Sequence, residues 1–287
     1  MFKRFRYYVE YILFLFFIRL FRLLPYHVSS YIGGKIMGSL GGLFKASKTA
    51  RKNLEQAMPD LSNKEYGRII RGVWNNLGRT FAEFPHVVDF SQKQFDQLVE
   101  VEGHEVLRKF LANKEPLILF TAHFGNWEII SRYFVLNNMD VNIIYRPANN
   151  RMIDDEVVRL RTKNSNITMC EKGVLGAGKA IKNLLRNESM AIFVDQKLSE
   201  GIDVPFFGRN AKTTGLMANI ALKRNIPLFP LHIERDGNKF KLYIEDPIYV
   251  NEEGCKNDYD VMLRINKVIE RWVRRKPEEW FWVHNRW

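Results

Sequence analysis

The sequence predicts an α/β protein in which a mixed sheet is flanked by helices and preceded by an N-terminal membrane helix. Short apolar runs alternate with helical patterns from residue 117 onward, which is typical of a sheet covered by helices. The first 25 residues are mostly apolar, and the rest of the chain is long enough for one large core. We therefore expect a membrane anchor helix at residues 1–25 and a single domain at residues 26–287.

The N-terminal segment has three interpretations. Residues 7–24 are large and apolar except for Glu10, Arg19 and Arg22. As a helix they would measure about 27 Å, near the lower limit for crossing a bilayer. The segment either spans a membrane, or lies in the interface with its basic side chains among the headgroups, or is a soluble core helix. No small-residue cleavage site follows it, so we expect it to be retained.

The next stretch contains two features that each have two interpretations. Gly34, Gly38 and Gly42 recur at four-residue intervals. On a helix they would form a flat face against the first segment, whereas in a loop they would be chain breaks. Residues 45–53 carry a basic cluster that faces either anionic lipid or solvent.

The helices and strands of the body follow in order. Ser62 with Glu65 three residues later is a helix start signal, so residues 64–84 are expected to be helical. The apolar run 117–122 is expected to be a buried strand that ends at His123. Further strands are expected at residues 141–145, 191–194, 228–233 and 239–244. Further helices are expected at residues 129–136, 153–162, 178–185, 216–223 and 258–275.

The segment 121–128, Thr-Ala-His-Phe-Gly-Asn-Trp-Glu, contains the main candidates for chemistry. It sets His123 and Glu128 five positions apart, where a buried strand turns into a helix that starts near Asn126. A neutral imidazole can take a proton from an alcohol, and a carboxylate can hold the ring and stabilise the imidazolium. The alternative is a packed histidine with a carboxylate nearby by chance. No second His or Cys lies at ligand spacing, so no metal site is predicted.

The same segment resembles the H-x4-D/E signature of glycerolipid acyltransferases, in the version of the bacterial lipid A biosynthesis lauroyl/myristoyl acyltransferase family. Three further blocks resemble that family in the same order, and together they cover essentially the full chain. They are Tyr145-Arg146-Pro147 with Arg159-Leu160-Arg161, then Val194-Asp195-Gln196 with Thr213-Thr214-Gly215, and finally residues 277–287. The sequence departs from the family at Asn285, where a basic residue is common.

The resemblance implies a glycerolipid-acyltransferase-like fold and a membrane-associated acyltransferase. The implied reaction moves a lauroyl or myristoyl chain from acyl carrier protein to a hydroxyl of a 3-hydroxyacyl chain on a lipid A precursor. His123 would deprotonate that hydroxyl and Glu128 would hold the imidazole. No metal or cofactor is expected, because a thioester is already activated. The implied location is the bacterial inner membrane, with the catalytic domain on its cytoplasmic side.

The resemblance also implies a set of substrate-binding residues. Arg159 and Asp195 occupy positions tied to activity, and Arg146 suits a phosphate clamp because a guanidinium binds phosphate oxygens bidentately. The alternative for both arginines is a surface or structural ion pair. Thr213 and Thr214 could donate hydrogen bonds to substrate or cap the next helix. Asn126 belongs to the set because the amides at the Gly125-Asn126 helix start are candidate oxyanion donors.

The net charge of the chain indicates which classes of binding partner it favours. The chain has 44 Lys and Arg against 32 Asp and Glu, a formal net charge of +12. This suits an anionic membrane, a phosphorylated substrate or an acidic carrier protein. Nucleic acid is disfavoured because no helix-turn-helix, zinc-finger or RNP phrase is present. Two other functions stay open: acyl-CoA-dependent acylation of another glycolipid such as a phosphatidylinositol mannoside, and a non-catalytic lipid-binding membrane protein.

Overall fold

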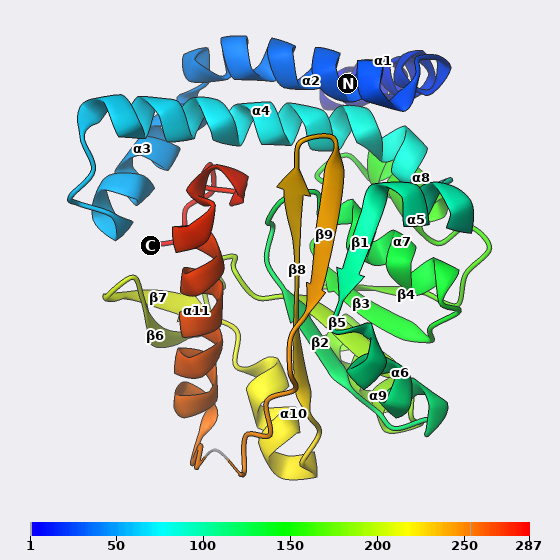
Figure 1. Cartoon of the computed structure of the whole chain (residues 1–287), viewed down its shortest axis with the longest axis vertical. Helices are drawn as coiled ribbons and strands as arrows, with labels where there is room; N and C mark the ends of the chain where they lie inside the picture. The colour runs from blue at the N-terminus through cyan, green and yellow to red at the C-terminus, as the bar shows by residue number, and fades with distance from the viewer. Residues whose placement is uncertain (1, 253) are drawn as a thin grey trace.

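The computed structural model describes residues 2–252 and 254–287. Its centre is a seven-stranded sheet with the strand order β1-β9-β8-β2-β5-β3-β4 (Figure 1). The β8–β9 pair is antiparallel and the other pairs of this sheet are parallel, so the predicted mixed sheet is confirmed. The strands are β1 (Val99–Glu102), β2 (Ile118–Thr121), β3 (Val141–Tyr145), β4 (Thr168–Glu171), β5 (Ser189–Phe193), β8 (Leu228–Asp236) and β9 (Lys239–Ile244). A separate antiparallel hairpin consists of β6 (Ile202–Phe206) and β7 (Arg209–Thr213).

Helices surround the sheet. The N-terminal half contributes α1 (Phe2–Leu23), α2 (Tyr26–Leu40), the 3-10 turn η1 (Gly41–Leu43), α3 (Lys45–Ala57), α4 (Asn63–Val87), α5 (Gln92–Leu98) and α6 (His104–Ala112). The rest contributes α7 (Glu128–Leu136), α8 (Arg151–Arg161), α9 (Val174–Leu184), α10 (Leu216–Arg224), α11 (Asp258–Arg275) and η2 (Pro277–Glu279). The predicted capping box is present, because the Ser62 side chain accepts from the Glu65 amide and Glu65 accepts from the Ser62 amide.

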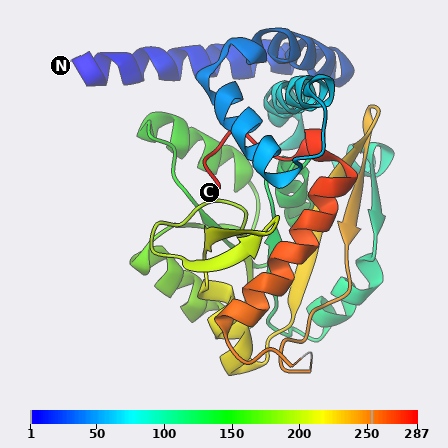
Figure 2. The ribbon, with the colours of Figure 1, turned by 90° about the vertical axis from the view of Figure 1, so that its left-hand side faces the viewer.

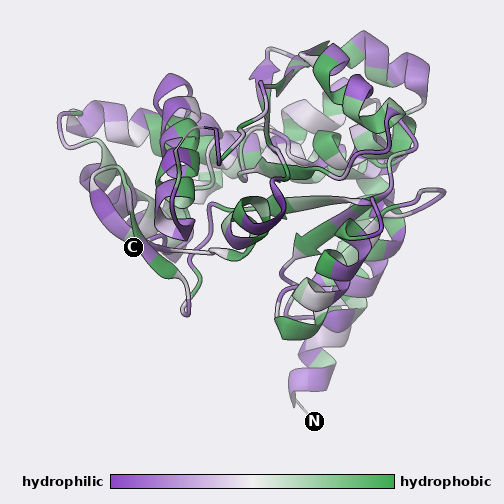
Figure 3. Cartoon of the chain, turned by 90° about the horizontal axis from the view of Figure 1, so that it is seen from below, coloured by the Kyte–Doolittle hydropathy of each residue, from purple (hydrophilic) through white to green (hydrophobic). Residues whose placement is uncertain are grey.

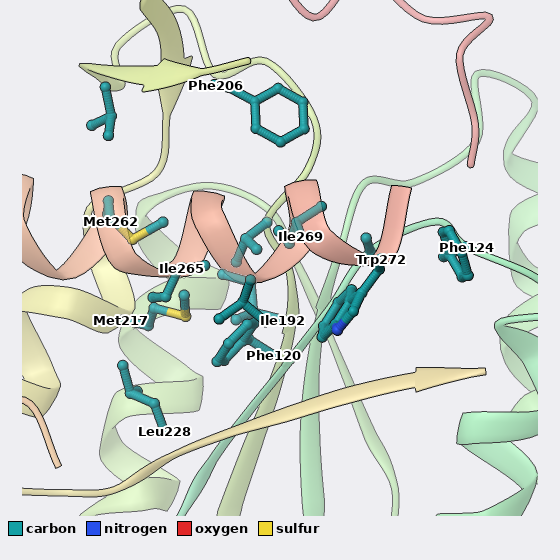
Figure 4. Packing of buried hydrophobic residues seen from close by; sticks show 14 of the residues in the cluster. Phe120, Phe124, Ile192, Phe206, Met217, Leu228, Met262, Ile265, Ile269 and Trp272 are labelled. Atoms are coloured by element: carbon teal, nitrogen blue, oxygen red, sulfur yellow. The ribbon is translucent and has the colours of Figure 1, made fainter. Parts of the chain in front are cut away.

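The strands carry apolar side chains on both faces of the sheet. In β2, Ile118 and Phe120 point to the face covered by α9, α10 and α11, and Leu119 points to the face covered by α6 and α7. Figure 4 shows Trp272 of α11 packed beside Phe120, and the two rings stack with centroids 6.2 Å apart. Burial on both faces explains why parallel strands such as β2 are continuous apolar runs.

Helix α4 lies across one end of the sheet, with α2 stacked on its outer side (Figure 1). Close approach of the two helices depends on glycines, because a Cβ at Gly33 or Gly78 would overlap the backbone of the other helix. The expectation that the glycine-rich segment forms a helix is confirmed, but its main partner is α4 and not the first helix. Gly42, in contrast, lies in open space.

Gly78→Ala is expected to lower the free energy of unfolding by about 2 kcal/mol, because the added methyl group collides with the Gly33 carbonyl and the Met37 side chain. Gly67→Ala is the matched control in the same helix, because nothing lies within 4 Å of its Cβ position. The control should gain roughly 0.5–1 kcal/mol from helix propensity. Urea unfolding of both variants measures the difference, and equal stability would contradict the packing of α2 on α4.

Helix α1 extends past the rest of the molecule at its N-terminal end (Figure 2). Its other end packs through Ile18 against Phe84, Val88 and Leu160. Apolar and polar residues are mixed along it (Figure 3). Within the described ranges, the search for a helix long and apolar enough to cross a bilayer found none. The expectation of a membrane-spanning N-terminal helix is therefore not supported, because Glu10, Arg19 and Arg22 interrupt the apolar stretch.

Candidate active site

The centre of the candidate site is a contact between His123 and Asp195. These residues follow β2 and β5, which are parallel neighbours in the register Thr121↔Phe193, so each lies two residues beyond its strand and the two are side by side. His123 Nδ1 lies 2.9 Å from Asp195 Oδ1, and the His123 amide donates to Oδ2 at 2.9 Å. The aspartate therefore fixes both the ring and the backbone of the histidine.

Asp195 is only 1% exposed and is held in its ionised form. Burial acts to raise the pKa of Asp195. The adjacent His123, the hydrogen bonds from His123 to the carboxylate, and His284 outweigh burial and hold the pKa well below its usual range. Trp280 Nε1 donates to Oδ2 at 2.9 Å. The ionised carboxylate favours the tautomer with the proton on Nδ1, which leaves a lone pair on Nε2.

His123 also borders a cavity. Within the described chain, Nε2 has no hydrogen-bond partner, and His123 lines a cavity of about 620 Å³. Aromatic rings frame the imidazole, with Phe193 at 4.5 Å, Trp127 at 5.3 Å and Phe281 at 5.9 Å between ring centroids. His123 thus borders the cavity with Nδ1 held by Asp195 and with Nε2 free of any partner among the described residues.

Glu128 has a different partner from the one that the spacing predicted. Arg161 of α8 donates from Nε to Glu128 Oε2 at 2.8 Å and from Nη2 to Oε1 at 2.5 Å. Trp127 Nε1 donates to Oε1 at 3.0 Å. The imidazole is held by Asp195, so the expectation that Glu128 holds it is wrong in this structure. The physical reason is that Glu128 begins α7, from where its carboxylate reaches the end of α8.

The Glu128–Arg161 pair is part of the cavity wall. Burial acts to lower the pKa of Arg161, but the Glu128 carboxylate together with Asp154 and Tyr145 outweighs burial and raises the pKa, so the guanidinium stays charged. Most of the remaining lining is apolar and includes Ile143, Ile144, Met169, Ile192, Phe193, Leu198 and Leu216. A largely apolar cavity that also contains polar groups suits an apolar chain with a polar head.

A second, more open cavity of about 740 Å³ lies between β9 and α11. Its lining includes Glu245, Asp246, Lys267 and Arg271 but contains no histidine, cysteine or serine. Without a base or a nucleophile of these kinds, it is a weaker candidate for catalysis than the cavity at His123.

The structure brings some of the predicted substrate-binding residues to the cavity and not others. Arg146 and Thr214 line it. Arg159 is exposed on α8 and pairs with Glu156 at 2.6 Å, which is the surface ion pair considered as its alternative. Thr213 is fully buried and accepts from Arg286 Nη2 at 2.8 Å. Arg159 and Thr213 are therefore not among the cavity-lining residues.

Asn126 and Gly125 lie outside the cavity lining and make hydrogen bonds to residues around the site. Asn126 is buried, donates from Nδ2 to Glu83 Oε2 at 2.7 Å, and accepts from the Glu128 amide at 3.2 Å. The Gly125 amide donates to the backbone oxygen of Glu279 at 2.9 Å. The Gly125 amide is thus occupied, which contradicts its expected availability as an oxyanion donor, and Asn126 does not line the cavity.

Three contributors to the site were not assigned from the sequence. Arg161 lies in the second family block, and Trp280 and His284 lie in the closing phrase. His284 Nε2 contacts the backbone oxygen of Asp195 at 3.1 Å. The only signal for them was membership of these blocks, since nothing in the local pattern relates residues 280–284 to residue 195.

No cluster of three or more His, Cys, Asp or Glu side chains that could hold a metal ion occurs in residues 2–252 and 254–287. The expectation that the reaction needs no metal or cofactor stays a prediction.

The fold and the site together define an α/β protein with a histidine–aspartate pair at a largely apolar cavity. The chain belongs to the bacterial lipid A biosynthesis acyltransferase family, whose model matches residues 1–287. It is 25% identical to the lipid A biosynthesis lauroyltransferase of Escherichia coli (strain K12) over 276 residues, which cover 92% of this chain and 86% of the relative. It is 24% identical to the palmitoleoyltransferase of lipid A biosynthesis from the same organism, with the same coverage. The resemblance stated from the four blocks is confirmed.

Proposed function

We propose that this protein transfers a lauroyl or myristoyl chain from acyl carrier protein to a hydroxyl of a 3-hydroxyacyl chain on a lipid A precursor. The observation that carries the proposal is the His123–Asp195 pair at the wall of a largely apolar cavity, with Nε2 of His123 unpartnered among the described residues, in a chain of this family. Relatives named for different acyl chains show that family membership alone does not set the chain length.

The proposed chemistry uses His123 as a general base. Nε2 of His123 takes the proton of the acceptor hydroxyl while the oxygen of that hydroxyl attacks the thioester carbonyl. Asp195 stabilises the imidazolium that forms, because its carboxylate is ionised and in contact with Nδ1. The C–S bond then breaks, the new C–O ester bond remains, and the imidazolium returns its proton to the leaving thiolate.

In this proposal Glu128 contributes through Arg161. The carboxylate holds the guanidinium in the cavity wall by two hydrogen bonds. A fixed cation beside the reacting groups can stabilise negative charge that develops on the thioester oxygen.

The direct test is transfer of labelled lauroyl or myristoyl from acyl carrier protein to a tetra-acylated lipid A precursor in detergent micelles. The wild type should form a penta-acylated product, and His123→Ala should lower kcat by about 10³-fold. His27→Ala, which changes a histidine outside the cavity, should keep wild-type activity. If the folded wild type makes no product with this donor but does so with acyl-CoA or another glycolipid, the donor or acceptor assignment is wrong. No product with any of them would favour a lipid-binding protein.

We also place the protein at the cytoplasmic face of the inner membrane, with α1 lying on the anionic surface. The support is a set of exposed apolar side chains on α1, namely Phe5, Tyr8, Ile12, Leu13, Phe16 and Phe17. Basic residues Lys3, Arg4 and Arg6 precede or accompany them. The double variant Ile12→Asp, Phe16→Asp should reduce flotation with anionic vesicles several-fold. Unchanged flotation would contradict a membrane contact through α1.

A further inference from the structure

Two cations lie side by side at the edge of the cavity and have no part in the proton transfer. Arg146 follows β3 and Lys172 follows β4, and both line the cavity. β3 and β4 are parallel neighbours in the register Tyr145↔Glu171, so the next residue of each strand is Arg146 on one and Lys172 on the other. The backbone amide of Lys172 donates to the backbone oxygen of Tyr145 at 2.7 Å, so the pairing of the two strands continues to this point.

Among the described residues these two cations have no carboxylate partner, whereas several basic residues near them are in ion pairs. These pairs are Arg151 with Glu171, Arg159 with Glu156, Arg161 with Glu128 and Lys163 with Asp89. Within residues 2–252 and 254–287, no acidic group lies within ion-pair distance of Arg146 or Lys172. Glu200 also lines the cavity but pairs with neither.

The arrangement is unfavourable for the protein alone. Two like charges at neighbouring positions repel each other. Both side chains are exposed to solvent, and partial desolvation at the cavity wall together with the adjacent Arg146 lowers the pKa of the Lys172 ammonium. An anion between the two side chains would relieve this repulsion.

We propose that Arg146 and Lys172 together bind a phosphate group of a substrate. A guanidinium binds phosphate oxygens bidentately and an ammonium adds a compact charge. This inference rests on the proposed function, in which the phosphate belongs either to the sugar of the glycolipid acceptor or to the pantetheine arm of the donor. The chemistry of recognition is the same for both sources.

The position of the pair predicts which kinetic constant it affects. Neighbouring strands lie about 4.8 Å apart, so the order β2-β5-β3-β4 puts Arg146 about 10 Å and Lys172 about 14 Å from His123 along the sheet edge. A phosphate bound there is remote from the reacting atoms. Its contacts act equally in the ground state and the transition state, so their loss should raise KM and leave kcat near the wild-type value.

The test is steady-state kinetics of Arg146→Ala and Lys172→Ala with both substrates varied. Each variant should raise KM for one substrate about 10-fold, and Lys172→Arg should recover most of the loss. Lys182→Ala is the matched control, because Lys182 is an exposed lysine of α9 that does not line the cavity. Higher salt should raise KM less in the two variants than in the wild type.

Phosphate-free substrates identify the source. If the donor supplies the phosphate, the effect of both variants should vanish with an acyl-N-acetylcysteamine donor. If the acceptor supplies it, the effect should vanish with a dephosphorylated acceptor. KM values equal to those of the Lys182→Ala control, or an effect that persists with both phosphate-free substrates, would overturn the inference. An inactive wild type would instead overturn the proposed function, and this inference with it.

Discussion

Asp195→Asn is expected to lower kcat by about 10³-fold while both KM values stay near those of the wild type. Asparagine has the same size but carries no charge, so it cannot stabilise the imidazolium. Its amide group can also donate to Nδ1, which would favour the tautomer with the proton on Nε2 and remove the base. Steady-state kinetics measure the loss, and circular dichroism checks that the fold is retained.

A matched control for this substitution is Asp203→Asn. Asp203 lies on β6, is exposed, and pairs with Lys212 at 2.7 Å away from the cavity. Its loss should change kcat by less than about twofold, because exposed ion pairs contribute little. If Asp195→Asn behaves like this control, Asp195 is not the functional partner of His123.

Removal of Glu128 and removal of Arg161 are expected to be equivalent and non-additive. Glu128→Ala and Arg161→Ala should each lower kcat about 10²-fold and lower stability by about 3 kcal/mol, because each leaves the other charge without its partner. The double variant should be no worse than either single variant, because the second substitution removes a group whose partner is already gone. Kinetics and thermal unfolding of the four proteins complete the cycle.

This double-mutant cycle distinguishes two roles for Glu128, one through Arg161 and one directly on His123. If Glu128 acted on His123 directly, its loss would reduce kcat by the same factor with or without Arg161, and the two losses would multiply. The Glu156–Arg159 pair on α8, in which Arg159 is exposed, is the control. Arg159→Ala should leave activity within about twofold of wild type. A large loss would show instead that Arg159 binds substrate, as the family resemblance implied.

The sequence predicted the longer elements of the fold and missed short or polar ones. Residues 141–145 and 239–244 were placed with the observed bounds. β1 and β4 have four residues each and include glutamates, so no apolar run marked them. The β6–β7 hairpin turns at Phe207 and Gly208, both at positive φ. A phenylalanine in that conformation is rare, so the usual Asn-Gly turn signal was absent.

The candidate site, too, could be predicted only in part from the sequence. His123 was found because it follows a clear apolar strand, and Glu128 because it lies at a known spacing from it. The partnership of His123 with Asp195 depends on β5 lying beside β2, between β2 and β3 in the sheet. Strand order of this kind is set by tertiary packing and is not encoded in local spacing. The Arg161–Glu128 pair likewise depends on the tertiary placement of the end of α8 beside the start of α7.

The most direct test of the account is the hydrogen-bonded imidazole proton of His123 in ¹⁵N-histidine-labelled protein. His123→Ala identifies the signal. The account predicts a downfield proton coupled to Nδ1 that is present in the wild type, persists in Glu128→Gln and disappears in Asp195→Asn. A signal that disappears in Glu128→Gln and persists in Asp195→Asn would show that Glu128 holds the imidazole, and would contradict the site described here.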